Sequence, residues 1–329
     1  MPILEVTELT KSYLISSKVK GLKDQRMLAL DRINLRLFPS QSLGVVGESG
    51  CGKSTLAKCL VMLERPDSGS IRLSGMEVTN KSGAELRSIR GRIQMVFQDP
   101  FSSLNPRMTV RDAILEAAVE HRAADLGTEK FFVSRLLEMI GIPEALADER
   151  PNRMSGGQRQ RVALARAMAV QPDVLVADEI VSALDVSIQA QILNLLSNIR
   201  REFALSVVFI SHDLAVVAQS TDRIAVMYLG KIVEEGPTSE IFRHPRHPYT
   251  RALLASHPEP GDKGFDAEPS LQGEIPSAFN MPTGCRFRTR CVYATPECAL
   301  TDPELVQCNG DHDVRVACFV RPFDNPRGR

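Results

Sequence analysis

The chain has 329 residues, which corresponds to about two domains of ordinary size. Its 40 Lys and Arg residues equal its 40 Asp and Glu residues, so it has no long-range positive field with which to hold nucleic acid or an anionic membrane. Hydrophobic residues make up 43% of the chain and charged residues 24%, which argues against a disordered chain and against a coiled-coil rod.

Two features of the sequence bear on location. It contains no run of roughly 18 to 20 apolar residues, the length that a membrane-spanning helix requires. Its first five residues, MPILE, lack the basic start and the apolar segment of an export signal. We therefore expect a cytoplasmic protein that reaches a membrane only by docking onto other subunits.

Residues 1–236 alternate between predicted strands and helices, which is typical of an α/β core with a largely parallel sheet. Two half-buried segments, 3–10 and 71–74, predict an antiparallel flank. Short apolar runs bounded by Gly, Pro or polar residues predict core strands at 42–46, 94–97, 174–177 and 207–210.

A helical insertion is predicted at about residues 100–155, because apolar residues recur at helical spacing over 110–119 and 133–140. The composition changes after residue 236: 12 of the 20 prolines lie in the last 93 residues, which makes long helices there improbable. We therefore place a domain boundary near 237, with a compact, loop-rich extension over 237–329.

Residues 47–54, GESGCGKS, match the phosphate-loop pattern between a predicted strand and a predicted helix. Backbone N–H groups of such a loop surround phosphates, the lysine neutralises the β and γ groups, and the serine hydroxyl can ligate Mg²⁺. The expected contacts to ATP and Mg²⁺ come from Gly47, Ser49, Gly50, Cys51, Gly52, Lys53, Ser54 and Thr55.

Two further segments carry candidate chemistry. The apolar strand 174–177 ends in Asp178 and Glu179, which suits a metal-linked carboxylate and a second acid that polarises an attacking water. Ser155, in an N-cap position, begins the segment SGGQ before an apolar-periodic helix. The exposed N–H donors of that helix start predict a second anion site, although an ordinary helix start accounts for the pattern equally well.

These motifs together resemble the nucleotide-binding subunit of an ABC transporter over nearly the whole chain. The resemblance implies a P-loop NTPase cassette with a signature at Ser155, Gly156, Gly157 and Gln158 that caps ATP on the opposite protomer. It also implies roles for the remaining residues: Gln98 as the glutamine that senses Mg²⁺ and the transmembrane partner, Glu179 orienting the lytic water, Asp185 lining the interface, His212 contacting the γ-phosphate, and Tyr13 stacking on adenine.

One residue departs from the family pattern. Ile180 follows Glu179 where the family usually has proline. We expect a competent site, with a less rigid turn because the fixed φ of proline is missing.

The segment 246–254, RHPYTRALL, is similar to the marker of the oligopeptide, dipeptide and nickel branch of ABC importers. The implied protein is the second ATPase subunit of a peptide permease. The resemblance implies pairing with a second cassette, for which we expect a heterodimer while the sequence leaves a homodimer open. It also implies two transmembrane permease subunits and an external binding protein that selects the cargo. Nickel or another small solute remains an alternative cargo. A soluble ABC ATPase of DNA repair or translation is the alternative from another class of protein. The zero net charge disfavours that alternative, because it offers no positive surface for nucleic acid.

Five of the seven cysteines lie in the last 45 residues, which indicates metal ligation in a reducing compartment. The same branch implies that Cys285, Cys291, Cys298 and Cys318 bind one [4Fe–4S] cluster, with Cys308 as the competitor for the fourth position. The separations between these cysteines differ from the short spacing of common zinc sites, but zinc and unligated thiols remain alternatives. Charge compensation of the thiolates is expected from Arg286, Arg288 and Arg290.

Overall fold

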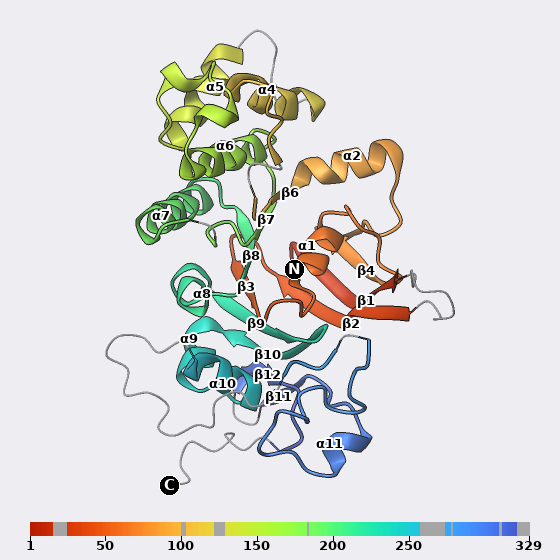
Figure 1. Cartoon of the computed structure of the whole chain (residues 1–329). Helices are drawn as coiled ribbons and strands as arrows, with labels where there is room; N and C mark the ends of the chain where they lie inside the picture. The colour runs from red at the N-terminus through yellow and green to blue at the C-terminus, as the bar shows by residue number, and fades with distance from the viewer. Residues whose placement is uncertain are drawn as a thin grey trace, which may run out of the picture.

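The computed structural model describes residues 1–15, 25–99, 103–121, 129–182, 184–256, 274–277, 279–308 and 311–320. Within these ranges the chain forms an eight-stranded sheet, a four-stranded sheet and the helices that pack on them (Figure 1). None of the helices in these ranges has the length and apolar character that crossing a membrane requires.

The larger sheet has the strand order β11-β12-β10-β9-β3-β8-β7-β6, and its central part is parallel as expected. The parallel strands are β3 (Ser42–Val46), β6 (Ile93–Val96), β7 (Val174–Asp178), β8 (Ser206–Ser211) and β9 (Arg223–Tyr228). Every residue of β3, β7 and β8 is buried, which explains why these strands read as continuous apolar runs. The predicted core strands therefore exist, with ends displaced by a residue at most.

The antiparallel flank predicted from segments 3–10 and 71–74 is a separate sheet with the order β2-β1-β4-β5. Its strands are β1 (Leu4–Ile15), β2 (Gln25–Leu37), β4 (Ser68–Leu73) and β5 (Met76–Glu77). Helix α1 (Lys53–Leu60) shares one buried apolar cluster with this flank and with the parallel sheet. This cluster fixes the N-terminus of α1 beside both sheets.

The helices predicted over 110–119 and 133–140 exist as α4 (Val110–Glu120) and α5 (Glu129–Met139), and Figure 1 shows them grouped with α6 (Gly156–Met168) in one lobe. Short 3₁₀ turns at Glu144–Leu146 and Pro151–Arg153 lie between α5 and α6, and α2 (Gly83–Arg92) precedes β6. A capping box begins α4: Thr109 Oγ1 accepts from the N–H of Asp112, and Asp112 Oδ2 accepts from the N–H of Thr109.

The chain after residue 182 forms α7 (Val186–Glu202), α8 (Leu214–Ser220), α9 (Thr238–Arg243), α10 (Pro248–Ala255) and α11 (Glu297–Leu300). Among the described residues after 237, the helices have at most 8 residues, as the prolines predict. The domain boundary near 237 stays a prediction. Strand β10 (Lys231–Pro237) pairs with β12 (Asp311–Val316), and β12 pairs with β11 (Val306–Cys308), so two strands of the extension continue the larger sheet.

Candidate nucleotide-binding site

The phosphate loop lies between β3 and α1, as the motif predicts. Gly52 immediately precedes α1 with φ +109°, and a Cβ on it would lie 2.4 Å from the carbonyl oxygen of Ala29. Only glycine fits this left-handed position against a neighbouring backbone. The close approach to β2 therefore anchors the end of the loop that begins the helix.

Lys53 is 4% exposed, and its ammonium is held against the loop itself. Its Nζ donates to the carbonyl oxygens of Gly47 at 2.7 Å and of Glu48 at 3.1 Å. These two bonds satisfy donors of a buried cation and keep its charge within the turn of the loop. The structure thus places the predicted phosphate-neutralising charge where the loop closes.

Asp178, at the end of β7, faces the start of α1. Ser54 Oγ donates to Asp178 Oδ1 at 3.4 Å, and Asp178 is 6% exposed. Burial raises the pKa of the Asp178 carboxyl, and the ammonium of Lys53 acts in the opposite direction. A buried carboxylate beside a hydroxyl fits Mg²⁺, which binds one or two carboxylates together with phosphate oxygens.

Glu179 is the meeting point of two other predicted site residues. Gln98 Nε2 donates to Glu179 Oε2 at 2.9 Å, and His212 Nδ1 lies 3.3 Å from Glu179 Oε1. Glu179 has φ +48°, a left-handed conformation that is rare outside glycine and is often found at functional sites. Three segments that are far apart in sequence therefore bring an acid, an amide and an imidazole together at one strand end.

The turn after Glu179 is held by contacts that do not need proline. Ser182 donates to the carbonyl oxygen of Glu179 both from its backbone N–H, at 3.2 Å, and from its hydroxyl, at 2.9 Å. Ile180 is 1% exposed and belongs to the main apolar core. Burial of Ile180 and the two hydrogen bonds constrain the turn in place of a fixed φ.

Tyr13, in β1, reaches the first turn of α1 with its hydroxyl group. Its hydroxyl contacts Thr55 Oγ1 at 3.5 Å and donates to Glu64 Oε2, while the ammonium of Lys11 lies 5.3 Å from the ring centroid. Burial, reinforced by Glu64, raises the pKa of Tyr13 to about 12. These contacts hold the Tyr13 ring beside Thr55, the residue that follows the phosphate-loop motif.

The signature residues begin α6 through a capping box. Ser155 Oγ accepts from the N–H of Gln158 at 3.3 Å, and Gln158 Oε1 accepts from the N–H of Ser155 at 2.9 Å. A Cβ on Gly157 would lie 2.6 Å from Cγ2 of Ile188 in α7, whereas one on Gly156 would meet Leu184 at an ordinary 3.5 Å. Gly157 thus permits close packing of α6 on α7.

Asp185 is the exposed N-cap residue of α7 and makes no capping bond with its side chain. It follows Leu184, which lies against the signature. In Figure 1, α6 lies in the lobe of α4 and α5, apart from α1. The signature and the phosphate loop of one chain thus belong to different parts of the molecule. Residue 183, which precedes Leu184, lies outside the described residues.

Comparison with known proteins supports the same reading of these motifs. Residues 30–182 match the family model described as ABC transporter, and residues 233–298 match the one described as oligopeptide/dipeptide transporter, C-terminal region. The chain is 46% identical to the oligopeptide transport ATP-binding protein OppF of Escherichia coli, with 96% of each chain covered. It is 44% identical to the oligopeptide transport ATP-binding protein AppF of Bacillus subtilis, with 97% of each chain covered.

This chain belongs to the ABC transporter ATP-binding proteins. Solved structures agree: a dimeric ATP-binding cassette in a post-hydrolysis state with bound ADP and Pi is 28% identical, with a TM-score of 0.63 over 71% of this chain and 98% of that one. CbiO1 from Clostridium perfringens gives a TM-score of 0.63 at 26% identity, over 78% of this chain and 95% of that one. The protein is therefore an ATP-binding ABC ATPase with the predicted P-loop cassette fold.

Four cysteines of the extension line one pocket beside α10. Cys285, Cys291, Cys298 and Cys318 line it, whereas the buried Cys308 at the end of β11 does not. Burial, reinforced by the neighbouring cysteines, raises the pKa of Cys291 to about 11. Within the described ranges, no group of three or more His, Cys, Asp or Glu side chains is placed to hold a metal ion.

Two arginines of the extension form ion pairs with the cassette that the sequence motifs did not predict. Only Arg288 of the three arginines expected near the thiols lines their pocket. Arg286 pairs with Asp31, and Arg290 pairs with Glu48 of the phosphate loop. Charge compensation of the thiolates by Arg286 and Arg290 was thus a wrong expectation, because both guanidinium groups are bound to carboxylates of the cassette core.

Proposed function

We propose that this protein is the ATP-hydrolysing subunit of an importer of dipeptides or oligopeptides, bound to the cytoplasmic face of the membrane. One observation supports it most: a single chain combines an ABC cassette with the C-terminal region described for oligopeptide/dipeptide transporters. Relatives that are 44–46% identical over nearly their whole length carry oligopeptide transport in their names.

The geometry around Glu179 supports a role as the group that orients the lytic water. Its Oε2 accepts from Gln98 and its Oε1 lies near His212, so both oxygens have a polar partner beside the phosphate loop. The side chain of His212 is half exposed and would contact the γ-phosphate. Gln98 would sense Mg²⁺ and the permease. Ser54, Asp178 and Gln98 would hold Mg²⁺, which supplies positive charge to the phosphate oxygens.

ATP would lie between two cassettes. Lys53 in the phosphate loop of one protomer and Ser155 in the signature of its partner would bind the same triphosphate, with Asp185 lining the interface and Tyr13 stacking on adenine. A solved cassette that is 29% identical is dimeric, with a TM-score of 0.62 over 71% of this chain and 98% of that one. The second protomer in this assembly is another cassette subunit, which makes a heterodimer.

The helical lobe of α4, α5 and α6 would pass cassette closure to two membrane-embedded permease subunits. In the sequence it lies between Gln98, the glutamine that would sense Mg²⁺ and the permease, and the helix that the signature begins. A secreted binding protein would choose the cargo. In this account residues 1–236 are the nucleotide-binding domain and residues 237–329 the extension.

Purification from membranes tests this function. We expect the chain to come from mild-detergent extracts with two hydrophobic subunits and a second cassette, and the complex to hydrolyse ATP faster with a peptide-loaded binding protein. If a nickel-loaded binding protein stimulates hydrolysis and a peptide-loaded one does not, the cargo is nickel and not peptides. Stoichiometric nucleic acid that persists at high salt, with no hydrophobic subunits, would contradict the transporter.

We propose that the pocket lined by Cys285, Cys291, Cys298 and Cys318 holds a [4Fe–4S] cluster. The four thiols line one pocket of the extension, two from the loop 285–291 and one each from α11 and from residue 318, and this number of soft ligands fits the group. The two metals require different spacing of the thiolates. A tetrahedral zinc ion with Zn–S bonds of about 2.3 Å holds any two sulfurs only about 3.8 Å apart. A [4Fe–4S] cluster binds each thiolate to a different iron, so its four ligands lie farther apart. The cluster would crosslink the loops of the extension.

A further inference from the structure

The loop that carries the first two pocket cysteines, residues 285–291, contacts the phosphate loop through Arg290. Its Nη1 donates to Glu48 Oε2 at 2.7 Å and its Nη2 to Glu48 Oε1 at 3.0 Å, a two-point contact across 242 residues of sequence. The Arg290 side chain is 5% exposed and that of Glu48 is 19% exposed. Burial shields this pair from water and salt, so its geometry matters more than that of a surface ion pair.

The guanidinium group of Arg290 is fixed by its surroundings. It lies 5.9 Å from the ring centroid of Tyr228 and 6.0 Å from that of Phe287, and both rings are buried. Its Nη1 also donates to the Tyr228 hydroxyl at 3.4 Å. Aromatic side chains thus hold Arg290 in the orientation that Glu48 requires.

Glu48 is a central residue of the phosphate loop. Its carbonyl oxygen accepts from Lys53 Nζ at 3.1 Å and from the N–H of Cys51 at 3.3 Å, while its own N–H donates to the Tyr249 hydroxyl at 2.9 Å. Movement of this residue would therefore displace Lys53, which is expected to neutralise the phosphates. An uncompensated carboxylate at this position would also repel a triphosphate.

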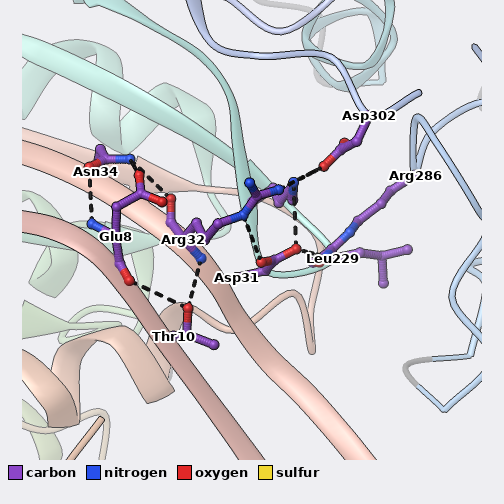
Figure 2. A network of polar contacts seen from close by, with 9 residues as sticks. Glu8, Thr10, Asp31, Arg32, Asn34, Leu229, Arg286 and Asp302 are labelled. Carbon is purple, nitrogen blue, oxygen red and sulfur yellow. Dashed lines mark hydrogen bonds and ion pairs between the residues drawn. The ribbon is translucent and has the colours of Figure 1, made fainter. Parts of the chain in front are cut away.

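A second contact leads from the same cysteine loop to the phosphate loop. Arg286 donates to the carbonyl oxygen of Leu229 and pairs with Asp31 (Figure 2). The next residue, Gly230, donates from its N–H to the carbonyl oxygen of Cys51 at 2.8 Å. The cysteine loop thus supports the phosphate loop at two points, directly at Glu48 and through this turn at Cys51.

We propose that Arg290 is a positioning residue for nucleotide: it neutralises Glu48 and holds the phosphate loop in its binding conformation, which makes the folded cysteine loop a condition for tight nucleotide binding. The inference rests on the proposed role of the phosphate loop. Arg290 acts through Glu48 and needs no contact with the nucleotide itself.

The test measures the affinity of the full-length chain for Mg·ADP, a phosphate-loop ligand that is not consumed, by titration calorimetry. We expect Arg290→Gln to bind about tenfold more weakly, within the range typical of coupling between two sites. The matched control is Arg315→Gln, because Arg315 also lies in the extension and also pairs with a carboxylate, but that carboxylate is Glu235 of β10 and not a residue of the phosphate loop. This control is expected to keep its affinity within about twofold.

A rescue experiment separates positioning from general stability. Adding Glu48→Gln to Arg290→Gln removes the charge that needs compensation, so the double variant is expected to recover most of the lost affinity. Equal affinity of Arg290→Gln and the wild type, or an equal loss with and without Glu48→Gln, would overturn the proposal. If Arg290→Gln does not fold, Arg290→Lys replaces it in the test. Lysine cannot make the two-point contact with Glu48, so we expect the affinity to fall about threefold. Wild-type affinity of Arg290→Lys would overturn the proposal.

Lys53→Ala distinguishes this inference from the proposed function. Nucleotide binding that does not depend on Lys53 would contradict the phosphate-loop assignment itself. Binding that depends on Lys53 but is unchanged by Arg290→Gln would contradict only the role of Arg290.

Discussion

Gln98 and Glu179 are 81 residues apart in sequence, yet Gln98 Nε2 donates to Glu179 Oε2 at 2.9 Å. The residue that leads into the helical lobe thereby touches the proposed water-orienting acid. Any displacement of the lobe that moves Gln98 must change the surroundings of Glu179. This contact gives a structural basis for linking the movement of permease subunits to hydrolysis.

Replacing Glu179 with glutamine should stop turnover while nucleotide still binds. Glutamine keeps the size and one acceptor but cannot take up a proton, so we expect phosphate release by the assembled complex to fall about 10² to 10⁴-fold. ATP should remain trapped in a closed cassette pair. The control is Glu202→Gln at the exposed end of α7. Undiminished hydrolysis by Glu179→Gln would reject this role.

Replacing Gly157 with alanine should loosen the packing of α6 on α7. The new Cβ would lie 2.6 Å from Cγ2 of Ile188, and we expect a loss of about 1 to 3 kcal/mol in the free energy of unfolding. Gly156→Ala is the matched control, because its Cβ would lie 3.5 Å from Leu184, an ordinary contact distance. This variant should keep the free energy of unfolding of the wild type. Denaturant titration of both variants measures the difference, and equal stability of the two would show that α6 does not depend on this contact.

The dependence of stability on pH should change when Glu234 is removed. Burial raises the pKa of Glu234 to about 7 and lowers the pKa of His247 to about 3. Because its pKa is raised in the folded chain, Glu234 destabilises the fold as the pH rises above about 4.5. Because its pKa is lowered in the folded chain, His247 destabilises the fold as the pH falls below about 6.5. Between these values the folded chain holds a proton on Glu234 and the unfolded chain holds one on His247, so the two contributions cancel.

Glu234→Gln should expose the contribution of His247. The glutamine oxygen can still accept a backbone N–H from the 246–247 segment, which Glu234 binds at 2.7 and 3.0 Å. Relative to the wild type, the unfolding free energy of the variant should fall by up to about 1.4 kcal/mol for each pH unit between about 6.5 and 4.5. Denaturant titrations at several pH values in this window measure both slopes, and parallel slopes would contradict the raised pKa of Glu234.

Iron content distinguishes the two candidates for the fourth thiolate. Cys318 lines the pocket of the other three thiols and Cys308 does not. We therefore expect Cys318→Ser, purified anaerobically, to lose its iron and inorganic sulfide, and Cys308→Ser to retain both. Zinc in place of iron would contradict the cluster while preserving the ligand set, whereas iron loss only in Cys308→Ser would contradict the ligand set.

Local patterns were enough to predict the strands of the parallel sheet and the phosphate loop. The continuous apolar runs at β3, β7 and β8 reflect burial on both faces, and the glycines and lysine of the loop lie within eight consecutive residues. Resemblance to a family then selected Gln98, Glu179 and His212, which no local pattern connects. The structure brings these three together, and their chemical roles stay predictions until variants are measured.

The amino-acid sequence by itself determined the cassette, because strand burial, helix periodicity and the phosphate loop are short-range properties that neighbouring residues encode. Only the tertiary structure decided that Arg290 compensates Glu48 rather than a thiolate, that Cys318 rather than Cys308 joins the other cysteines, and that β12 of the extension pairs with β10. Each of these depends on which distant segments pack side by side. A guanidinium group, a thiol or a strand edge has many chemically acceptable partners, and spatial proximity alone selects among them.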